Sequence, residues 1–220
     1  MKEKLIIFGN GQIAEVAYCY LSQSKNHEIV GFCVHQKYNT NTHFLGLNVF
    51  DFETIEKKFP PAEYKLFAPV AYHSVNSIRK KIYEEGKLKG YNFATYVHPN
   101  AINNAETIGE NCFILEQNVL QPRVRIGDNV VLWSGNHIGH HSVIENHVFL
   151  ASHVVVSGAV TIGERTFIGV NATLRDNIVI GKENIIGAGA LILSNTEDYS
   201  VFPGTASSPI SKKSYDLKKI

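Results

Sequence analysis

Residues 101–196 read, in blocks of six, AINNAE TIGENC FILEQN VLQPRV RIGDNV VLWSGN HIGHHS VIENHV FLASHV VVSGAV TIGERT FIGVNA TLRDNI VIGKEN IIGAGA LILSNT. The second position of each of these sixteen blocks is Ile, Leu or Val, from Ile102 to Ile192. Glycine is frequent at the third position, and small or β-branched residues are frequent at the sixth. This repeat decides the fold of the larger part of the chain.

A period of six matches neither an α-helix nor the alternation of an isolated strand, and it is typical of a hexapeptide-repeat parallel β-helix. We expect the second-position side chain to point into a narrow core and the sixth-position residue to pack beside it. We expect the third-position glycine to allow corner backbone geometry that a Cβ would resist. Three blocks form one triangular coil, so the repeat predicts about five coils and a prism roughly 25 Å tall. A β-sandwich with coincidental spacing explains this regularity poorly.

Composition narrows the classes of function. The chain has 220 residues and a formal net charge of +1, so no electrostatic argument favours nucleic acid as a partner. No apolar run approaches the length of a membrane span, and the start, MKEKLIIFGNG, predicts a first β-strand rather than a signal peptide. The cysteines, odd in number and widely spaced, are Cys19, Cys33 and Cys112. They indicate reduced thiols and a cytoplasmic protein.

The region before the repeat predicts a small α/β domain with a parallel sheet, because apolar strand patterns alternate with helical ones. Strands are expected over 4–9, 28–34, 64–71 and 93–97. Helices are expected from Ile13 to Leu21, over 52–59 before Pro60, and from Val75 to Gly86 or Gly90. The period changes at 98–101, which we take as the domain junction. The predicted domains are therefore 1–98, 99–196 and a C-terminal cap and tail at 197–220.

The loop Gly9-Asn10-Gly11-Gln12-Ile13-Ala14 fits the pattern G-x-G-x-x-A between a strand and a helix. Such a loop presents backbone N–H groups and a helix N-terminus to a phosphate. A dinucleotide site would also need a carboxylate at the end of the second strand, where this chain has His35 and Lys37. The pattern therefore favours a mononucleotide diphosphate over NAD, with His35 or Lys37 near the phosphates or ribose. A simple tight turn remains the alternative.

The C-terminal residues include two lysine pairs, Lys212-Lys213 and Lys218-Lys219. An open β-helix end exposes strand edges, so the first part of this segment is expected to cover the last coil. The lysine pairs are consistent with a solvated tail or, alternatively, with contacts to the phosphates of a ligand.

Histidines cluster within the repeat at His137, His140, His141, His147 and His153. His141, His147 and His153 are six residues apart and diverge on successive corners, so no metal site is expected within one chain. Hydrogen bonding to neighbouring turns is the favoured interpretation of His147 and His153. His140 can instead act as a general base at neutral pH, with His141 hydrogen-bonded to it or contacting substrate.

With both regions in view, the chain resembles the left-handed β-helix acyltransferases of the PglD/NeuD type, which acetylate nucleotide sugars in surface-glycan synthesis. The resemblance covers nearly the whole chain. It rests on FGNGQIAE at 8–15, YVHPNA at 96–101, NHIGHHSVI at 136–144, FIGVNATL at 167–174 and IIGAGALI at 185–192. It implies left-handed coiling, although parallel crossovers are usually right-handed, and a homotrimer.

The resemblance also implies site residues. His140 falls on the family's catalytic histidine, and His141 stands where many members carry a carboxylate. The acetyl-CoA positions, mostly backbone contacts, carry over to Gly158, Val170, Gly187 and Ala188. The nucleotide-sugar positions carry over to Gly9, Asn10, Gly11 and Gln12, with His35 and Lys37 in place of the family's acidic residues and Trp133 facing the sugar.

The implied reaction is acetyl-CoA-dependent N-acetylation of a dTDP- or UDP-linked 4-amino-4,6-dideoxy sugar, for an O-antigen, capsule or glycoprotein. The amine would attack the thioester directly, with His140 as base, backbone N–H groups at the oxyanion and no metal. O-acetylation of a sugar hydroxyl, as in sialic-acid modification, is the alternative enzyme activity. A non-catalytic nucleotide-binding scaffold is the alternative from another class of protein.

Overall fold

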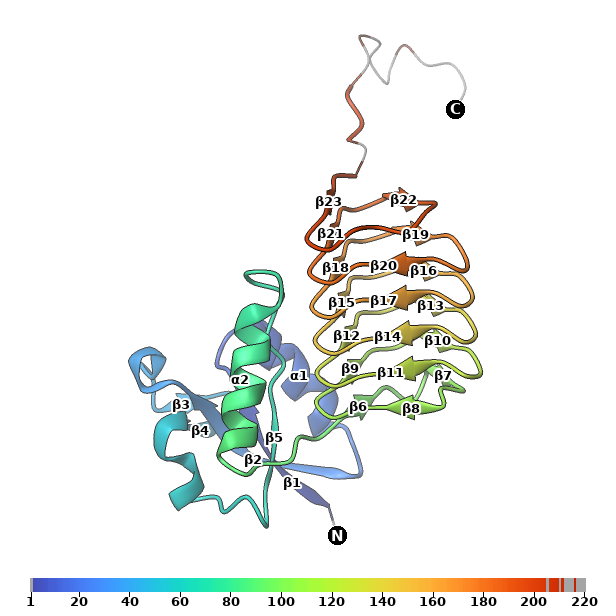
Figure 1. The fold of residues 1–220 in the computed structure, drawn as a ribbon. Coiled ribbons are helices and arrows are strands. Elements are labelled where there is room, and N and C mark those ends of the chain that lie inside the picture. The colour runs from blue at the N-terminus through green and yellow to red at the C-terminus, as the bar shows by residue number, and fades with distance from the viewer. Residues whose placement is uncertain (1, 205, 210, 212–215, 217–220) are drawn as a thin grey trace.

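The computed structural model describes residues 2–204, 206–209, 211 and 216, and the lysine pairs at 212–213 and 218–219 lie outside them. An α/β domain lies beside a tall triangular prism of stacked coils (Figure 1). The predicted fold class, a parallel-sheet α/β domain followed by a left-handed β-helix, is confirmed.

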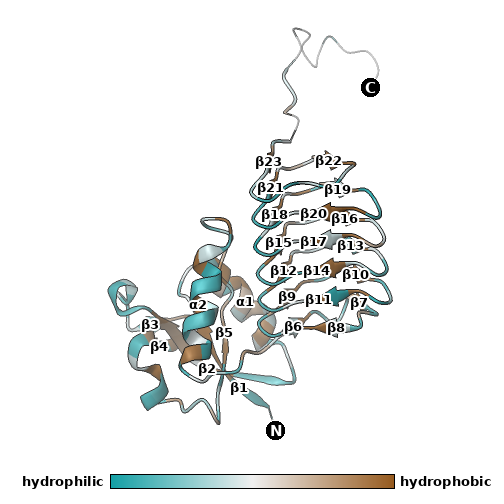
Figure 2. Cartoon of the chain, viewed as in Figure 1, coloured by the Kyte–Doolittle hydropathy of each residue, from teal (hydrophilic) through white to brown (hydrophobic). Residues whose placement is uncertain are grey.

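The α/β domain holds a five-stranded sheet in the order β3-β4-β2-β1-β5. Its strands are parallel except for the antiparallel pair β3–β4. The central sheet is hydrophobic, whereas the outer side of α2 is largely hydrophilic (Figure 2). The elements are β1 (Glu3–Phe8), α1 (Gln12–Ser22), β2 (His27–Val34), the 3₁₀ turn η1 (Gln36–Tyr38), β3 (His43–Phe44), β4 (Leu47–Asp51), the 3₁₀ helix η2 (Phe52–Lys57), β5 (Lys65–Phe67) and α2 (Ser77–Leu88).

The structure of this domain differs from the sequence analysis by one unpredicted hairpin and by two predicted strands that are shorter or divided. The hairpin β3–β4 was not predicted, because its strands are short and include polar residues. The strand expected over 64–71 ends at Phe67, shortly before Pro69, which lacks the N–H needed to continue a ladder. The segment expected as a final domain strand over 93–97 is divided. Phe93 makes only a bridge to Leu66, and Tyr96–Val97 is the first β-helix strand, so the β-helix begins before the predicted junction.

The β-helix strands form three faces, numbered here in chain order. The first face holds β6 (Tyr96–Val97), β9 (Phe113–Ile114), β12 (Val131–Leu132), β15 (Phe149–Leu150), β18 (Phe167–Ile168), β21 (Ile185–Ile186) and β23 (Val201–Phe202). The second holds β7 (Ile102–Asn103), β10 (Val119–Leu120), β13 (His137–Ile138), β16 (Val155–Val156), β19 (Thr173–Leu174) and β22 (Leu191–Ile192). The third holds β8 (Thr107–Ile108), β11 (Arg125–Ile126), β14 (Val143–Ile144), β17 (Thr161–Ile162) and β20 (Val179–Ile180).

Three corners join these faces. The first corner, between the first and second faces, includes residues 133–136 and 151–154. The second corner, between the second and third faces, includes 139–142 and 157–160. The third corner, which returns to the first face, includes 127–130 and 145–148.

The second-position side chains fill the core as predicted, and from Ile114 to Ile192 each is at most 5% exposed. Ile108 is only partly buried, and Ile102 departs furthest from the prediction, because its side chain is 59% exposed. Ile102 pairs with Val119, seventeen residues on, whereas Val119 pairs with His137, eighteen residues on. The first coil is therefore one residue shorter, and Ala101 rather than Ile102 packs against the core.

The predicted reason for the third-position glycines was wrong. These glycines do not adopt the left-handed backbone, which occurs instead at the fifth position of the blocks from Asn111 to Gly189, as at Asn111 and His141 with φ of 53° and 61°. Third-position glycine is needed instead for the close stacking of coils. A Cβ on Gly139 would stand 2.5 Å from the carbonyl carbon of Ser157 in the next coil.

The α/β domain covers the first face and the third corner. Aromatic side chains that point outward from the first face, such as Phe113 and Phe149, pack against the domain's own apolar residues. From α2, the buried guanidinium of Arg79 donates to the backbone carbonyls of Asn129 and His147, and Lys80 lies 2.7 Å from Glu164. The second corner lies on the far side of the prism from this domain (Figure 1).

The segment after the last block covers the final coil. The side chains of Asn195, Thr196 and Asp198 accept hydrogen bonds from backbone N–H groups of that coil, at Val179, Gly181 and Lys182. Strand β23 then pairs in parallel with β21 on the first face. These contacts satisfy edge groups that an open prism would expose.

Candidate functional site

The second corner presents His140 and His141 to solvent. The Nδ1 atoms of the two rings lie 3.1 Å apart, and the rings are nearly perpendicular. The backbone N–H of His140 donates to Oε1 of Gln121 in the coil below, at 2.8 Å. Gln121 thus holds the backbone of His140, and His141 holds its ring at Nδ1. The contact with Gln121 was not predicted from the sequence.

Gly158 stands one coil above His140 at the same corner. A Cβ on Gly158 would lie 2.7 Å from Cε1 and 2.8 Å from Nε2 of His140, so the imidazole occupies the space that only glycine leaves open. The N–H of Gly158 donates to no acceptor within the part of the chain that the structure describes. The corner therefore combines an exposed imidazole with an adjacent backbone donor that another molecule can reach.

The glycine loop lines a hollow of about 990 Å³ in the α/β domain. The hollow joins the N-terminus of α1 to the end of β2, the segment after β5 and one side of α2. All six α/β-domain residues predicted for the nucleotide line it: Gly9, Asn10, Gly11, Gln12, His35 and Lys37. Lys81 and His73 also line it and were not predicted, and the lining includes no Asp or Glu. An anionic ligand suits this hollow.

His35 is less available to a ligand than its place in the sequence indicates. Its Nδ1 lies 3.2 Å from Glu53, its Nε2 lies 3.2 Å from Glu85, and its ring packs edge-on against Phe8 and Phe52. Both ring nitrogens therefore face carboxylates of the same domain. Lys37, by contrast, is exposed at the rim beside Tyr38.

The remaining predicted residues lie at the first corner. Val170 and Ala188 are exposed there, and Gly187 is partly exposed. Trp133 is also at this corner, partly buried against an apolar cluster that includes residues of α1, and it does not line the hollow. The positions predicted for acetyl-CoA thus divide between two corners, with Gly158 at the second and the others at the first.

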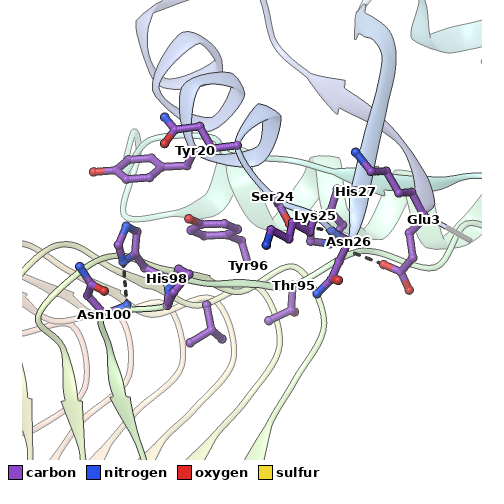
Figure 3. Close-up of a pocket in the computed structure, with 14 residues that line it drawn as sticks. Glu3, Tyr20, Ser24, Lys25, Asn26, His27, Thr95, Tyr96, His98 and Asn100 are labelled. Carbon is purple, nitrogen blue, oxygen red and sulfur yellow. Dashed lines mark hydrogen bonds and ion pairs between the residues drawn. The ribbon is translucent and has the colours of Figure 1, made fainter.

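A groove of about 1270 Å³ contains none of the predicted residues. It lies between the C-terminal end of α1 and the start of the β-helix, where Tyr20, Tyr96 and His98 gather (Figure 3). The Tyr20 hydroxyl donates to Glu116 at 2.8 Å, and burial raises the pKa of Tyr20 to about 12. This groove is a junction between the two regions of the chain.

The other repeat histidines lie apart. His147 is buried at the third corner, where its Nδ1 lies 2.8 Å from Nδ2 of Asn129, as expected for hydrogen bonding between turns. The ring of His153 lies over Gly135 at the first corner. Across the described ranges, no three His, Cys, Asp or Glu side chains come together in a way that suits a metal ion.

The thiols of Cys33 and Cys112 are buried. Burial raises the pKa of Cys112 to about 12 and raises that of Cys33 further, so neither is a ready nucleophile.

Among the residues described, no helix has the length and apolar character needed to cross a membrane.

Comparison with known proteins agrees with this architecture. The family model described as "Bacterial transferase hexapeptide (six repeats)" matches residues 107–140, 124–158 and 159–194. No curated protein sequence matches the chain.

Several solved structures share the fold over almost the full length. The acetyltransferase domain of PglB from Neisseria gonorrhoeae, in complex with acetyl coenzyme A, has 23% identity and a TM-score of 0.81, covering 96% of this chain and 100% of its own. PerB from Caulobacter crescentus, in complex with CoA and GDP-perosamine, has 21% identity and a TM-score of 0.78, covering 90% and 92%. WeeI from Acinetobacter baumannii has 18% identity and a TM-score of 0.77, covering 91% and 96%. At these identities the likeness establishes the shared fold.

Proposed function

We propose that this chain is an acyltransferase that moves the acetyl group of acetyl-CoA to the amine of a nucleotide-linked sugar. The observation that carries the proposal is the second corner, where the exposed His140 imidazole lies against Gly158, whose N–H has no acceptor among the described residues. The anion-suited hollow beside the glycine loop supports a nucleoside diphosphate as the handle of the acceptor. PglB and PerB, which share the fold, were solved with acetyl coenzyme A and with CoA plus GDP-perosamine.

The chemistry at the corner is a direct transfer. The sugar amine attacks the thioester carbon, so an N–C bond forms and the C–S bond breaks. His140 Nε2 takes the proton from the amine and passes it to the departing thiolate. The Gly158 N–H stabilises the oxyanion that develops on the carbonyl oxygen. Cys33 and Cys112 are buried, so these two thiols are not available as nucleophiles at the corner.

The proposal requires more than one copy of the chain. The hollow belongs to the domain on the first face, whereas His140 lies at the second corner, on the other side of the prism. In a homotrimer whose three-fold axis is parallel to the prism, equivalent residues of the three copies lie at the same height along that axis. His140 and Trp133 belong to the same coil, so His140 of one copy would meet the first corner of the next near Trp133.

Exposed apolar residues support this homotrimer. Val155 and Leu191 point outward from the second face, which lies between the first and second corners, and are 40% and 61% exposed. Acetyl-CoA would then lie between copies, against Gly158 of one and against Val170, Gly187 and Ala188 of the next. Trp133 would face the sugar.

For the acceptor we propose a dTDP- or UDP-linked 4-amino-4,6-dideoxy sugar, used in surface-glycan synthesis in the cytoplasm. Lys37 and Lys81 at the hollow provide positive charge for the diphosphate. The free cysteines suit a reducing compartment.

The test is thiol release from acetyl-CoA with a panel of dTDP-, UDP- and GDP-linked sugars carrying a 3-amino, a 4-amino or no amino group. Turnover with one 4-amino sugar is expected and would name the acceptor. Turnover only with a non-amino sugar would replace N-acetylation by O-acetylation. No turnover with any sugar, together with no acetyl-CoA binding, would contradict an enzymatic role.

A further inference from the structure

The contact between His140 and His141 joins two nitrogen atoms of the same kind. Their Nδ1 atoms lie 3.1 Å apart at the second corner, and neither histidine has a carboxylate partner within the described residues. A neutral imidazole carries its proton on one nitrogen and a lone pair on the other. A hydrogen bond between the two Nδ1 atoms therefore needs one proton between them, on one ring or the other.

The side that holds this proton decides what His140 can do. If His141 donates, His140 accepts at Nδ1 and carries its own proton on Nε2, so Nε2 has no lone pair for a substrate amine. If His140 donates, its Nε2 lone pair is free at the edge of the ring that lies against Gly158. Only the second arrangement provides a base next to the N–H of Gly158.

We propose that His141 is the positioning residue of the reaction and acts as a neutral acceptor that keeps the proton of His140 on Nδ1. This inference rests on the proposed function of His140 as the base. When Nε2 takes the proton from the amine, His140 becomes an imidazolium whose Nδ1–H still donates to the His141 lone pair. When Nε2 passes that proton to the thiolate, the pair returns to its starting state. His141 gains and loses no proton in the cycle.

The corner backbone allows this role to be tested without disturbing the fold. His141 has a left-handed φ of 61°, which many residue types resist. At the same corner, Ala159 one coil above and Asn177 two coils above adopt φ of 56° and 57°. Alanine and short polar residues therefore fit this backbone, so His141→Ala and His141→Asp are matched variants. Asp offers an acceptor at the distance of Nδ1, and Ala offers none.

The experiment combines turnover with nitrogen-15 NMR of histidine-labelled full-length protein, with the His140 signals assigned by their loss in His140→Asn. The expected spectra show His140 protonated on Nδ1 in the unaltered protein and in His141→Asp, and on Nε2 in His141→Ala. His141→Ala is expected to lose roughly tenfold to hundredfold in kcat with KM little changed, as when a reacting group is misplaced. His141→Asp is expected to restore most of that loss.

Two results would overturn the proposal. One is a neutral His140 that carries its proton on Nε2 in the unaltered protein. The other is His141→Ala with unchanged kcat, or with a loss only in KM, which would make His141 a substrate contact. Because the NMR measurement needs no substrate, it decides which nitrogen of His140 carries the proton even if the panel of sugars reveals no transfer. The proposed function fails separately, through absence of turnover in the unaltered protein.

Discussion

The second and third corners of the β-helix carry histidines at the same position of consecutive blocks, yet their surroundings are opposite. His141 and His147 both adopt a left-handed φ, of 61° and 63°. His141 is exposed and contacts another imidazole, whereas His147 is 5% exposed and lies beneath α2. Burial, followed by the charge of Arg79, lowers the pKa of His147 to about 4.

The repeat therefore places a side chain at a corner but does not by itself give that side chain a role. The fifth position guarantees a tight turn, and the element that covers the corner decides whether an imidazole there is structural or reactive. The α/β domain covers the third corner through Arg79 and leaves the second corner open. A tenfold change in rate corresponds to about 1.4 kcal/mol, so effects on turnover and on stability can be compared on one scale.

Removing the imidazole at the open corner should have the largest effect. His140→Ala is expected to lower turnover by roughly 10² to 10⁴, because a positioned general base contributes that much. The measurement is thiol release with the sugar that the unaltered protein accepts. His43→Ala, an exposed histidine on β3, is the matched control and should be unaffected. Near-normal turnover in His140→Ala would remove this corner from the mechanism.

Removing the Arg79 side chain, which links α2 to the third corner, should lower the free energy of unfolding. Arg79→Met keeps most of the side-chain volume but leaves the carbonyls of Asn129 and His147 without a donor. Unfolding by denaturant should show a loss of about 3 kcal/mol. Arg123→Met, at an exposed ion pair, should change stability by no more than about 0.5 kcal/mol. Equal losses in the two variants would mean that Arg79 does not anchor the domain.

The buried histidine should make stability depend on pH. The pKa of His147 is about 4 in the folded protein and 6.5 in the unfolded chain. As the pH falls below 6.5, His147 is therefore protonated in the unfolded chain before it is protonated in the folded protein. The folded state is therefore destabilised progressively from pH 6.5 down to about 4, by about 3 kcal/mol. His147→Asn should flatten this part of the stability curve, since Asn occupies equivalent corner positions at Asn111 and Asn129. An unchanged curve would show that His147 is not the group responsible.

The smallest effect is expected one coil above the open corner. Gly158→Ala adds a Cβ that would stand 2.7 Å from the His140 ring, so the ring must move. About tenfold lower turnover is expected, because displacement of a reacting group is costly in rate. Acetyl-CoA binding, measured by calorimetry, should fall much less than turnover. Loss of both in equal proportion would mean that Gly158 binds acetyl-CoA without positioning His140.

Periodicity predicted the parts of the molecule that repeat. The buried column from Ile114 to Ile192 follows from the second position of each block, and the glycine loop follows from its place between a strand and a helix. The exposure of Ile102 could not be predicted, because it depends on a coil one residue shorter at the domain junction. The hairpin β3–β4 was missed because its strands give no clear alternation.

Contacts between segments far apart in the chain could also not be predicted from the sequence. Arg79 reaches backbone carbonyls about fifty residues or more away, at Asn129 and His147, and nothing local to α2 marks it as an anchor. Gln121 supports His140 from the coil below, which only the stacking reveals. His35 was expected near a ligand, but the carboxylates that face its nitrogens come from η2 and α2.

In the proposed enzyme, the second corner of one copy completes the nucleotide hollow of another. Mixing His140→Ala chains with chains carrying Lys37→Glu and Lys81→Glu tests it directly, once differently tagged subunits are shown to exchange. Each variant alone should be nearly inactive. After exchange in equal amounts, about a quarter of the sites in a closed ring receive an intact corner and an intact hollow, so about a quarter of full turnover should return. No recovery after proven exchange would contradict a site shared between copies.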